Sequence, residues 1–150
     1  ACSIAAFNAL RIESGTPLFG VDFDDENLPQ EVSRDELAIS FTKGCYLGQE
    51  VVARIHYRGG VQRLPRGLRF GGETPPPAGA ELLLDGRAVG RATSVAQSPR
   101  WGAIGLGVLH QRGSAPGTRL EIAGSGMSMA AEVALWRPSS SSPPLPTKWM

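Results

Sequence analysis

The sequence predicts an α+β protein in which helical segments precede a small antiparallel β-barrel. Apolar residues recur at helical spacing near the N-terminus and again between residues 46 and 57. From residue 62 onward the pattern changes to short alternating segments that Gly-rich turns separate, with no further helical pattern between them. A closed barrel of six or so strands is the expected arrangement, because closure removes exposed sheet edges.

The first helix is expected from Ala1 to Ile12, where apolar side chains recur at helical spacing until Gly15 and Pro17 end the pattern. Ser3 lies almost at the first residue, so no N-cap is evident. We therefore expect the chain to have been cut from a longer protein.

The segment after this helix is expected to be a loop and one short helical turn. Its acidic cluster lacks the central Gly and the terminal Glu of a calcium loop, which predicts a solvated loop at Asp22, Asp24, Asp25 and Glu26. The residues Ser33 to Glu36 resemble a capping box and predict the helical turn.

The barrel strands are delimited by turn signals. Asp85-Gly86 predicts a hairpin, Gly90 a bulge, and the three prolines between residues 71 and 79 an exposed turn. Pro65 confines its strand to an edge or a bulge. The alternating segments are Gln62–Phe70, Ala80–Leu84, Arg87–Val89, Arg91–Gln97, Ala103–Leu109, Thr118–Ile122 and Met129–Trp136.

The stretch from Phe41 to Gly60 concentrates residues that can do chemistry. A helix from Tyr46 to Tyr57 places Cys45 in or just before its first turn, where the macrodipole favours a thiolate. Lys43 adds positive charge nearby. A buried packing role is the alternative for an isolated cysteine, and the surrounding residues favour the reactive thiol.

These residues resemble the signature K-G-C-Y-x-G-Q-E of the YgfZ-type folate-binding proteins, here from Lys43 to Glu50. Those proteins are relatives of the glycine-cleavage T protein, an aminomethyltransferase, and assist iron–sulfur cluster assembly and repair. The upstream segment from Leu10 to Asp22 is similar to the family's R-x-E-x-G-x-P-x-x-G segment, and L-P-Q-E follows from Leu28 to Glu31. The resemblance runs from Phe7 to about Trp136.

The resemblance implies three regions, and composition adds a fourth. Residues 1–41 are the end of a folate-binding domain, 42–60 are the motif loop and helix, and 61–137 are the barrel domain. The Pro- and Ser-rich residues 138–150 are expected to be a disordered tail on composition alone.

The resemblance also implies a cofactor and a site. The cofactor is tetrahydrofolate or another folate form, with Glu13 as the pterin ligand and with Arg11 and Tyr46 as further binding residues. Cys45 and Lys43 are the expected catalytic residues, and iron–sulfur client or assembly proteins are the expected partners.

Two other functions stay open at this stage. One is a folate-dependent aminomethyltransferase of the glycine cleavage system, and the other is a barrel that serves as an interaction module with an inert cysteine. One-carbon transfer to folate needs a positioned acid and an orienting arginine rather than a thiol, so the K-G-C motif favours the accessory factor.

Composition narrows the possible binding partners, the cellular compartment and the cofactors. A net charge of +1, without a basic block, argues against nucleic-acid or membrane-surface binding. Two cysteines do not form a disulfide framework, which predicts a reducing, cytoplasmic compartment. The cysteines and histidines show no paired ligand spacing, so no resident metal is expected. We expect a monomer.

Overall fold

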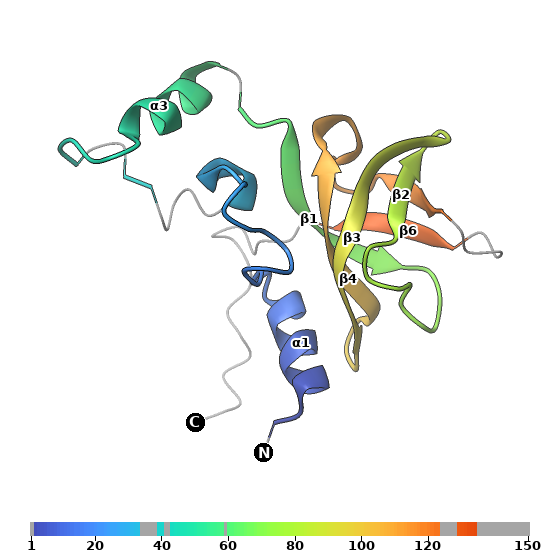
Figure 1. Ribbon diagram of the computed structural model, residues 1–150. Coiled ribbons are helices and arrows are strands. Elements are labelled where there is room, and N and C mark those ends of the chain that lie inside the picture. Colours follow the sequence, from blue (N-terminus) through green and yellow to red (C-terminus); the bar gives the residue numbers. More distant parts are fainter. Residues whose placement is uncertain (1, 34–38, 41–42, 59, 124–128, 135–150) are drawn as a thin grey trace.

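The computed structural model describes residues 2–33, 39–40, 43–58, 60–123 and 129–134. Helix α1 and a β-barrel lie side by side, and helix α3 extends away from them (Figure 1). The elements are helix α1 (Ile4–Glu13), the 3₁₀ helix η1 (Pro29–Val32), helix α3 (Gln49–Arg58), strands β1 (Arg63–Phe70), β2 (Glu81–Leu84), β3 (Arg87–Ser98) and β4 (Gly102–His110), the 3₁₀ helix η2 (Gln111–Gly113), and strands β5 (Arg119–Ile122) and β6 (Ala130–Ala134).

The six strands form a closed antiparallel barrel in the order β1-β4-β3-β2-β5-β6. Alternating side chains point inward along each strand, because the side-chain period of a strand is two. The largest fully buried side chains of the interior are Leu68, Leu82, Leu109, Leu120 and Val133. The predicted α+β class and the six-stranded barrel are confirmed.

The predicted hairpin joins β2 to β3. Asp85 and Gly86 have φ values of 51° and 72°, the left-handed pair that a tight hairpin turn requires. The bulge is also confirmed, because the register shifts between Leu82, which pairs with Gly90, and Leu83, which pairs with Ala88. Strand β3 then continues without a break to Ser98, so the two segments predicted there are one strand.

The structure tests the predictions made for Pro65 and for the triple-proline turn. Strand β1 pairs with β4 from Arg63 onward but with β6 only from Gly67, so Pro65 lies on the edge part of the strand as predicted. The triple-proline turn is only partly exposed, because Pro76 is buried. That part of the prediction is wrong, since the turn folds back towards the sheet: Gly79 N–H donates to the Ala92 carbonyl at 2.7 Å.

Helix α1 packs on the outer face of β3 and β4. It begins at Ile4, and the Ser3 hydroxyl accepts a hydrogen bond from Ala6 N–H at 3.1 Å, so the helix does have an N-cap. Ile12 is fully buried in a small cluster on the barrel with Ile104 and Leu106. The expected absence of a cap was wrong because Ser3 precedes the first helical residue directly.

Helix α3 is amphipathic as predicted but begins at Gln49 rather than Tyr46. Val52 is buried, and its carbonyl accepts a hydrogen bond from Gln30 Nε2 at 3.0 Å, which joins α3 to η1. Leu47 is fully exposed and does not share that apolar face.

Some predictions fall on residues outside this description. The helical turn expected after Ser33 involves residues 34–38, and the tail covers residues 138–150. Neither is tested here, nor are the bounds of the four predicted regions. Within the part of the chain that the structure describes, no helix has the length and apolarity needed to cross a membrane.

Candidate functional site

A buried ion pair ties α1 to the loop that follows it. Arg11 Nη1 lies 2.8 Å from Asp22 Oδ2, and their side chains are only 7% and 4% exposed. The hydroxyls of Thr93 and Ser94, both on β3, donate to Asp22 Oδ1 at 2.5 and 2.6 Å. Asp22 is therefore not part of a solvated loop, and that prediction is wrong for this residue.

Arg11 is held from several sides. Its guanidinium also donates to Ser94 Oγ at 2.7 Å and to Asn8 Oδ1 at 2.8 Å. Leu18 N–H also donates to Asp22 Oδ2 at 2.9 Å, so the backbone of the loop is fixed at the ion pair. With 8% of the residue exposed, Arg11 positions the loop against the barrel, and the expected direct contact with a cofactor is not what this geometry favours.

Glu13 ends α1 beside the turn between β3 and β4. Ser98 Oγ donates to Glu13 Oε1 at 2.5 Å, and Ser98 itself is buried. The backbone N–H groups of Arg100 and Trp101 donate in turn to Ser98 Oγ. Glu13 is half-buried, and no described residue donates to its second oxygen, Oε2. The carboxylate is therefore oriented and keeps an acceptor for a ligand.

The same corner of the barrel carries an aromatic ring between cations. The guanidinium carbons of Arg69 and Arg100 each lie 4.9 Å from the centre of the Trp101 ring, within cation–π range. Neither Ser98 nor Trp101 was found from the sequence. The available signal was the Ser-Pro-Arg-Trp turn, since a serine before a proline favours turn formation.

The motif cysteine lies in a loop. Cys45 is an exposed free thiol four residues before the first residue of α3. The prediction that it lies in or just before the first helical turn is wrong, because the turn at Leu47 and Gly48 delays the helix. The helix dipole acts only within the first turn, so it does not reach this sulfur. Lys43 Nζ lies 4.7 Å from the centre of the Tyr46 ring.

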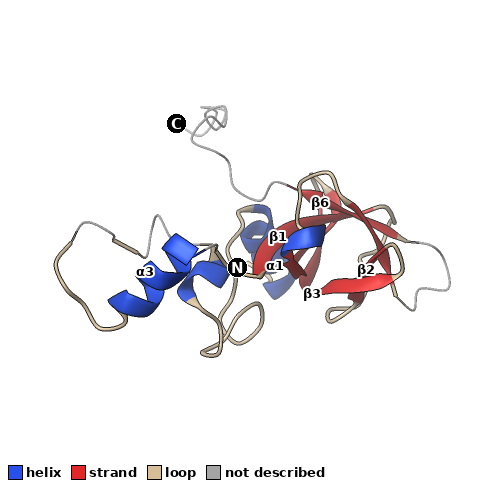
Figure 2. Cartoon of the chain, turned by 90° about the horizontal axis from the view of Figure 1, so that it is seen from above, coloured by secondary structure: helices blue, strands red, loops and turns tan. Residues whose placement is uncertain are grey.

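The predicted site residues do not form one cluster. Arg11 and Glu13 lie on α1 against the barrel, while Lys43, Cys45 and Tyr46 lie on the loop before α3. Figures 1 and 2 show from two directions that α3 and this loop extend away from α1 and the barrel. The two halves of the predicted site are thus separate in this chain.

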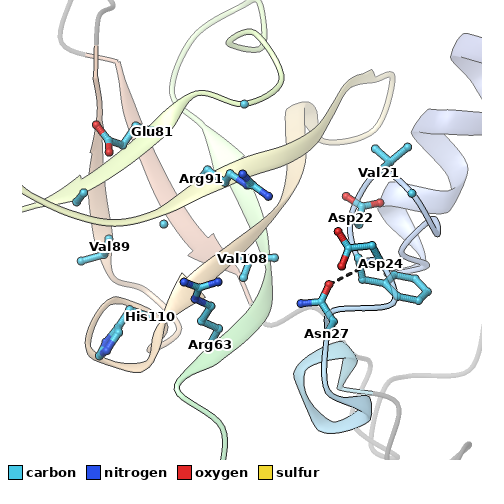
Figure 3. A pocket seen from close by; sticks show the side chains of 15 residues that line it. Val21, Asp22, Asp24, Asn27, Arg63, Glu81, Val89, Arg91, Val108 and His110 are labelled. Carbon is cyan, nitrogen blue, oxygen red and sulfur yellow. Dashed lines mark hydrogen bonds between the residues drawn. The ribbon is translucent and has the colours of Figure 1, made fainter.

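A pocket of about 600 Å³ lies between the loop at residues 20–27 and the outside of the barrel. Strands β1, β3 and β4 form one wall with Arg63, Arg91 and His110, and the loop forms the other with Asp24 and Asn27 (Figure 3). Asp22 lines its edge, so the buried ion pair also shapes this pocket. Sequence reasoning did not find it, because its walls come from distant segments.

No three His, Cys, Asp or Glu side chains in the described ranges gather closely enough to hold an ion. A bound cluster at Cys45 would therefore need further ligands from elsewhere.

The barrel matches a known domain. Residues 65–138 match the family model of the glycine cleavage T-protein C-terminal barrel domain. A solved structure, the glycine cleavage system aminomethyltransferase T from Bartonella henselae, superposes with a TM-score of 0.79 at 24% identity over 87% of this chain and 37% of that chain. The class of protein is thereby defined: the chain carries a barrel of the glycine cleavage T type.

Sequence relatives narrow this class. The tRNA-modifying protein YgfZ from Edwardsiella ictaluri is 49% identical over 81 residues, which are 53% of this chain and 24% of the relative. An aminomethyltransferase from Nostoc is 36% identical over 101 residues, 67% of this chain and 27% of the relative. The chain is similar in sequence to YgfZ-type proteins and to aminomethyltransferases, and its barrel matches that of the glycine cleavage T protein. It spans about a quarter of the length of these relatives.

Proposed function

We propose that this protein binds a folate and acts as an accessory factor for iron–sulfur proteins. The observation that carries the folate part is the geometry of Glu13. Ser98 orients its carboxylate through Oε1, and Oε2 stays available to accept a hydrogen bond from a ligand. The relationship to aminomethyltransferases supports the same cofactor class. Tetrahydrofolate is the form we propose.

The donor set fits a pterin. The exocyclic amine and the adjacent ring N–H of a pterin are two donors that a carboxylate can accept together. Oε2 can accept one of them directly, and Oε1 has a second lone pair beyond its bond from Ser98. Arg11 helps to hold the Glu13 carboxylate in place, because its bonds to Asp22 and Ser94 fix α1 and the following loop to β3.

Glu13→Gln should weaken tetrahydrofolate binding by about 1–3 kcal/mol, because one acceptor oxygen becomes an amide donor that faces ring N–H groups. Ser98→Ala should weaken it by a smaller amount, since the carboxylate loses only its orienting hydroxyl. Isothermal titration of tetrahydrofolate into each variant measures both effects.

Glu121→Gln is the matched control, because Glu121 is exposed on β5, where its strand neighbours are Leu83 and Ala130 and not residues of the Glu13 corner. Its dissociation constant should equal that of the unmodified protein. Equal constants for Glu13→Gln and the unmodified protein would remove Glu13 from the site.

Cys45 is the residue that we propose to serve iron–sulfur proteins. It is exposed on a loop that stands apart from the barrel, so a partner protein can approach its sulfur (Figure 2). A thiolate ligates iron, and the described residues supply no companion ligands, which favours a cluster carried by the partner.

The Edwardsiella relative is named for tRNA modification. A net charge of +1 favours an effect through proteins over direct RNA contact. We propose a monomer in the cytoplasm.

Cys45→Ser should abolish support of iron–sulfur enzymes in cells while the protein stays folded, because the exposed side chain contributes little packing. Lys43→Ala should slow alkylation of Cys45 by iodoacetamide, because a cation close to a thiol raises its reactivity. Cys2, the other exposed free cysteine, is the internal control, and its alkylation rate should not change. Full activity of Cys45→Ser would leave a folate-binding scaffold without a functional thiol.

An aminomethyltransferase is the second candidate, since the Nostoc relative aligns with 67% of this chain. Aminomethyl transfer would depend on the Glu13 corner and not on the thiol. An assay of folate-dependent aminomethyl transfer that is retained in Cys45→Ser and lost in Glu13→Gln would favour this activity over the accessory role.

A further inference from the structure

The pocket between the loop at residues 20–27 and the barrel is a second place where a ligand can bind, distinct from Glu13 and Cys45. Its volume of about 600 Å³ lies in the range of small-molecule sites. One wall is the rigid outer face of β1, β3 and β4, and the other is a loop that the Arg11–Asp22 pair holds against the same strands.

Two arginines on the barrel wall are the feature that selects a ligand. Arg63 lies opposite His110 in the register, and Arg91 lies opposite Val108, so the three polar side chains surround one apolar residue. Among the described residues, ion pairs within 4.0 Å are formed by Arg11 and Arg54, and neither Arg63 nor Arg91 has one. Figure 3 shows the Arg91 side chain directed across the pocket towards the loop.

The acidic residues of the lining form no ion pair within 4.0 Å with Arg63 or Arg91. Asp22 is already paired with Arg11. Asp24 Oδ1 accepts the backbone N–H of Glu26 at 3.1 Å, and Glu81 is the register partner of Arg91 on the neighbouring strand. The guanidinium groups of Arg63 and Arg91 therefore have donors for an oxyanion, the group whose planar geometry they match best.

Apolar side chains lie between the charged ones. Val108 on β4 faces the pocket between Arg63 and Arg91, and Val21 lines the opposite wall with 49% of its surface exposed. We propose that this pocket binds a small organic acid, with its carboxylate or phosphate on Arg63 and Arg91 and its apolar body against Val108 and Val21. The inference does not rest on the folate proposal, because it uses other residues.

Three probes of similar size test this and separate the two acid types: benzoate, phenyl phosphate and neutral benzamide. Each is titrated into the full chain while amide chemical shifts are followed by NMR. We expect one or both acids to shift Val21, Arg91 and Val108 saturably, benzamide to bind at least about tenfold more weakly, and high salt to weaken the acids. The tighter acid identifies the headgroup that the site takes.

The variant Arg63→Gln/Arg91→Gln should lower the affinity for the acids about tenfold or more and leave benzamide unchanged, because each arginine supplies charge-assisted hydrogen bonds. Both side chains are exposed, and an unchanged amide spectrum outside the pocket confirms that the variant is folded. Arg119→Gln, on β5 and outside the lining, is the matched control.

Three outcomes would overturn the proposal: no saturable shift with either acid, equal binding of acid and benzamide, or acid binding that survives in the double variant. Tetrahydrofolate titrated into the same double variant keeps the two proposals apart. Loss of acid binding with retained folate binding assigns the pocket a ligand of its own.

Discussion

Asp22→Ala should lower the free energy of unfolding by about 3–5 kcal/mol, the usual cost of removing one partner of a buried ion pair. The substitution leaves the Arg11 guanidinium, 7% exposed, without its carboxylate 2.8 Å away. It also removes the acceptor of the Thr93 and Ser94 hydroxyls, so α1, its loop and β3 all lose a shared contact. Urea denaturation followed by circular dichroism measures the change.

Asp25→Ala is the control in the same loop, because Asp25 is exposed and the substitution should cost little. Asp22→Asn adds a second comparison, since it keeps the shape of the side chain and removes its charge. A loss of less than about 1 kcal/mol for Asp22→Ala would show that Arg11 finds another partner or water, and that the pair does not hold the loop.

Gly90→Ala should destabilise the barrel by about 3 kcal/mol, at the upper end of the cost of overpacking a core. A Cβ atom at Gly90 would lie 2.1 Å from the Val108 carbonyl oxygen and 2.9 Å from Leu109 Cα. Both atoms belong to the backbone of β4, so they cannot move aside without separating β3 from its neighbour. The thermal midpoint and the urea midpoint of the variant should both fall.

Gly71→Ala is the matched substitution. Its Cβ would meet only the Ala130 carbonyl oxygen at 3.5 Å, an ordinary contact, so its stability should stay within about 0.5 kcal/mol of the unmodified protein. If the two variants unfolded at the same urea concentration, the close approach of β3 and β4 at Gly90 would not limit the side chain there.

Local patterns predicted the barrel well. The Asp85-Gly86 turn, the bulge at Gly90 and the edge position of Pro65 each depend on residues within a few positions of one another. Turn geometry and side-chain alternation are properties of such short segments, which explains why the sequence could be interpreted correctly there. Glu50 and Arg54 likewise pair at 3.1 Å, as their spacing of four predicts.

The Asp22 prediction was wrong for a different reason. An aspartate among other acidic residues is most often solvated, and nothing nearby in the chain indicates that Arg11 and β3 enclose this one. Its partners Thr93 and Ser94 are 71 and 72 positions away. Burial of a charge depends on which segments surround it, so only the packed structure could settle it.

The candidate site likewise combines features that the sequence predicted with features that depend on tertiary contacts. Glu13 was identified from a motif, and its availability for a ligand depends on Ser98, which lies 85 positions further along the chain. The sequence by itself determined the elements, because helix and strand periods and turn residues act over a few positions. Only the tertiary structure decided that the Cys45 loop stands apart from α1, and that Arg63 and Arg91 line one pocket together with the loop at residues 20–27. Those relations arise from contacts between segments distant in the chain, which no local pattern encodes.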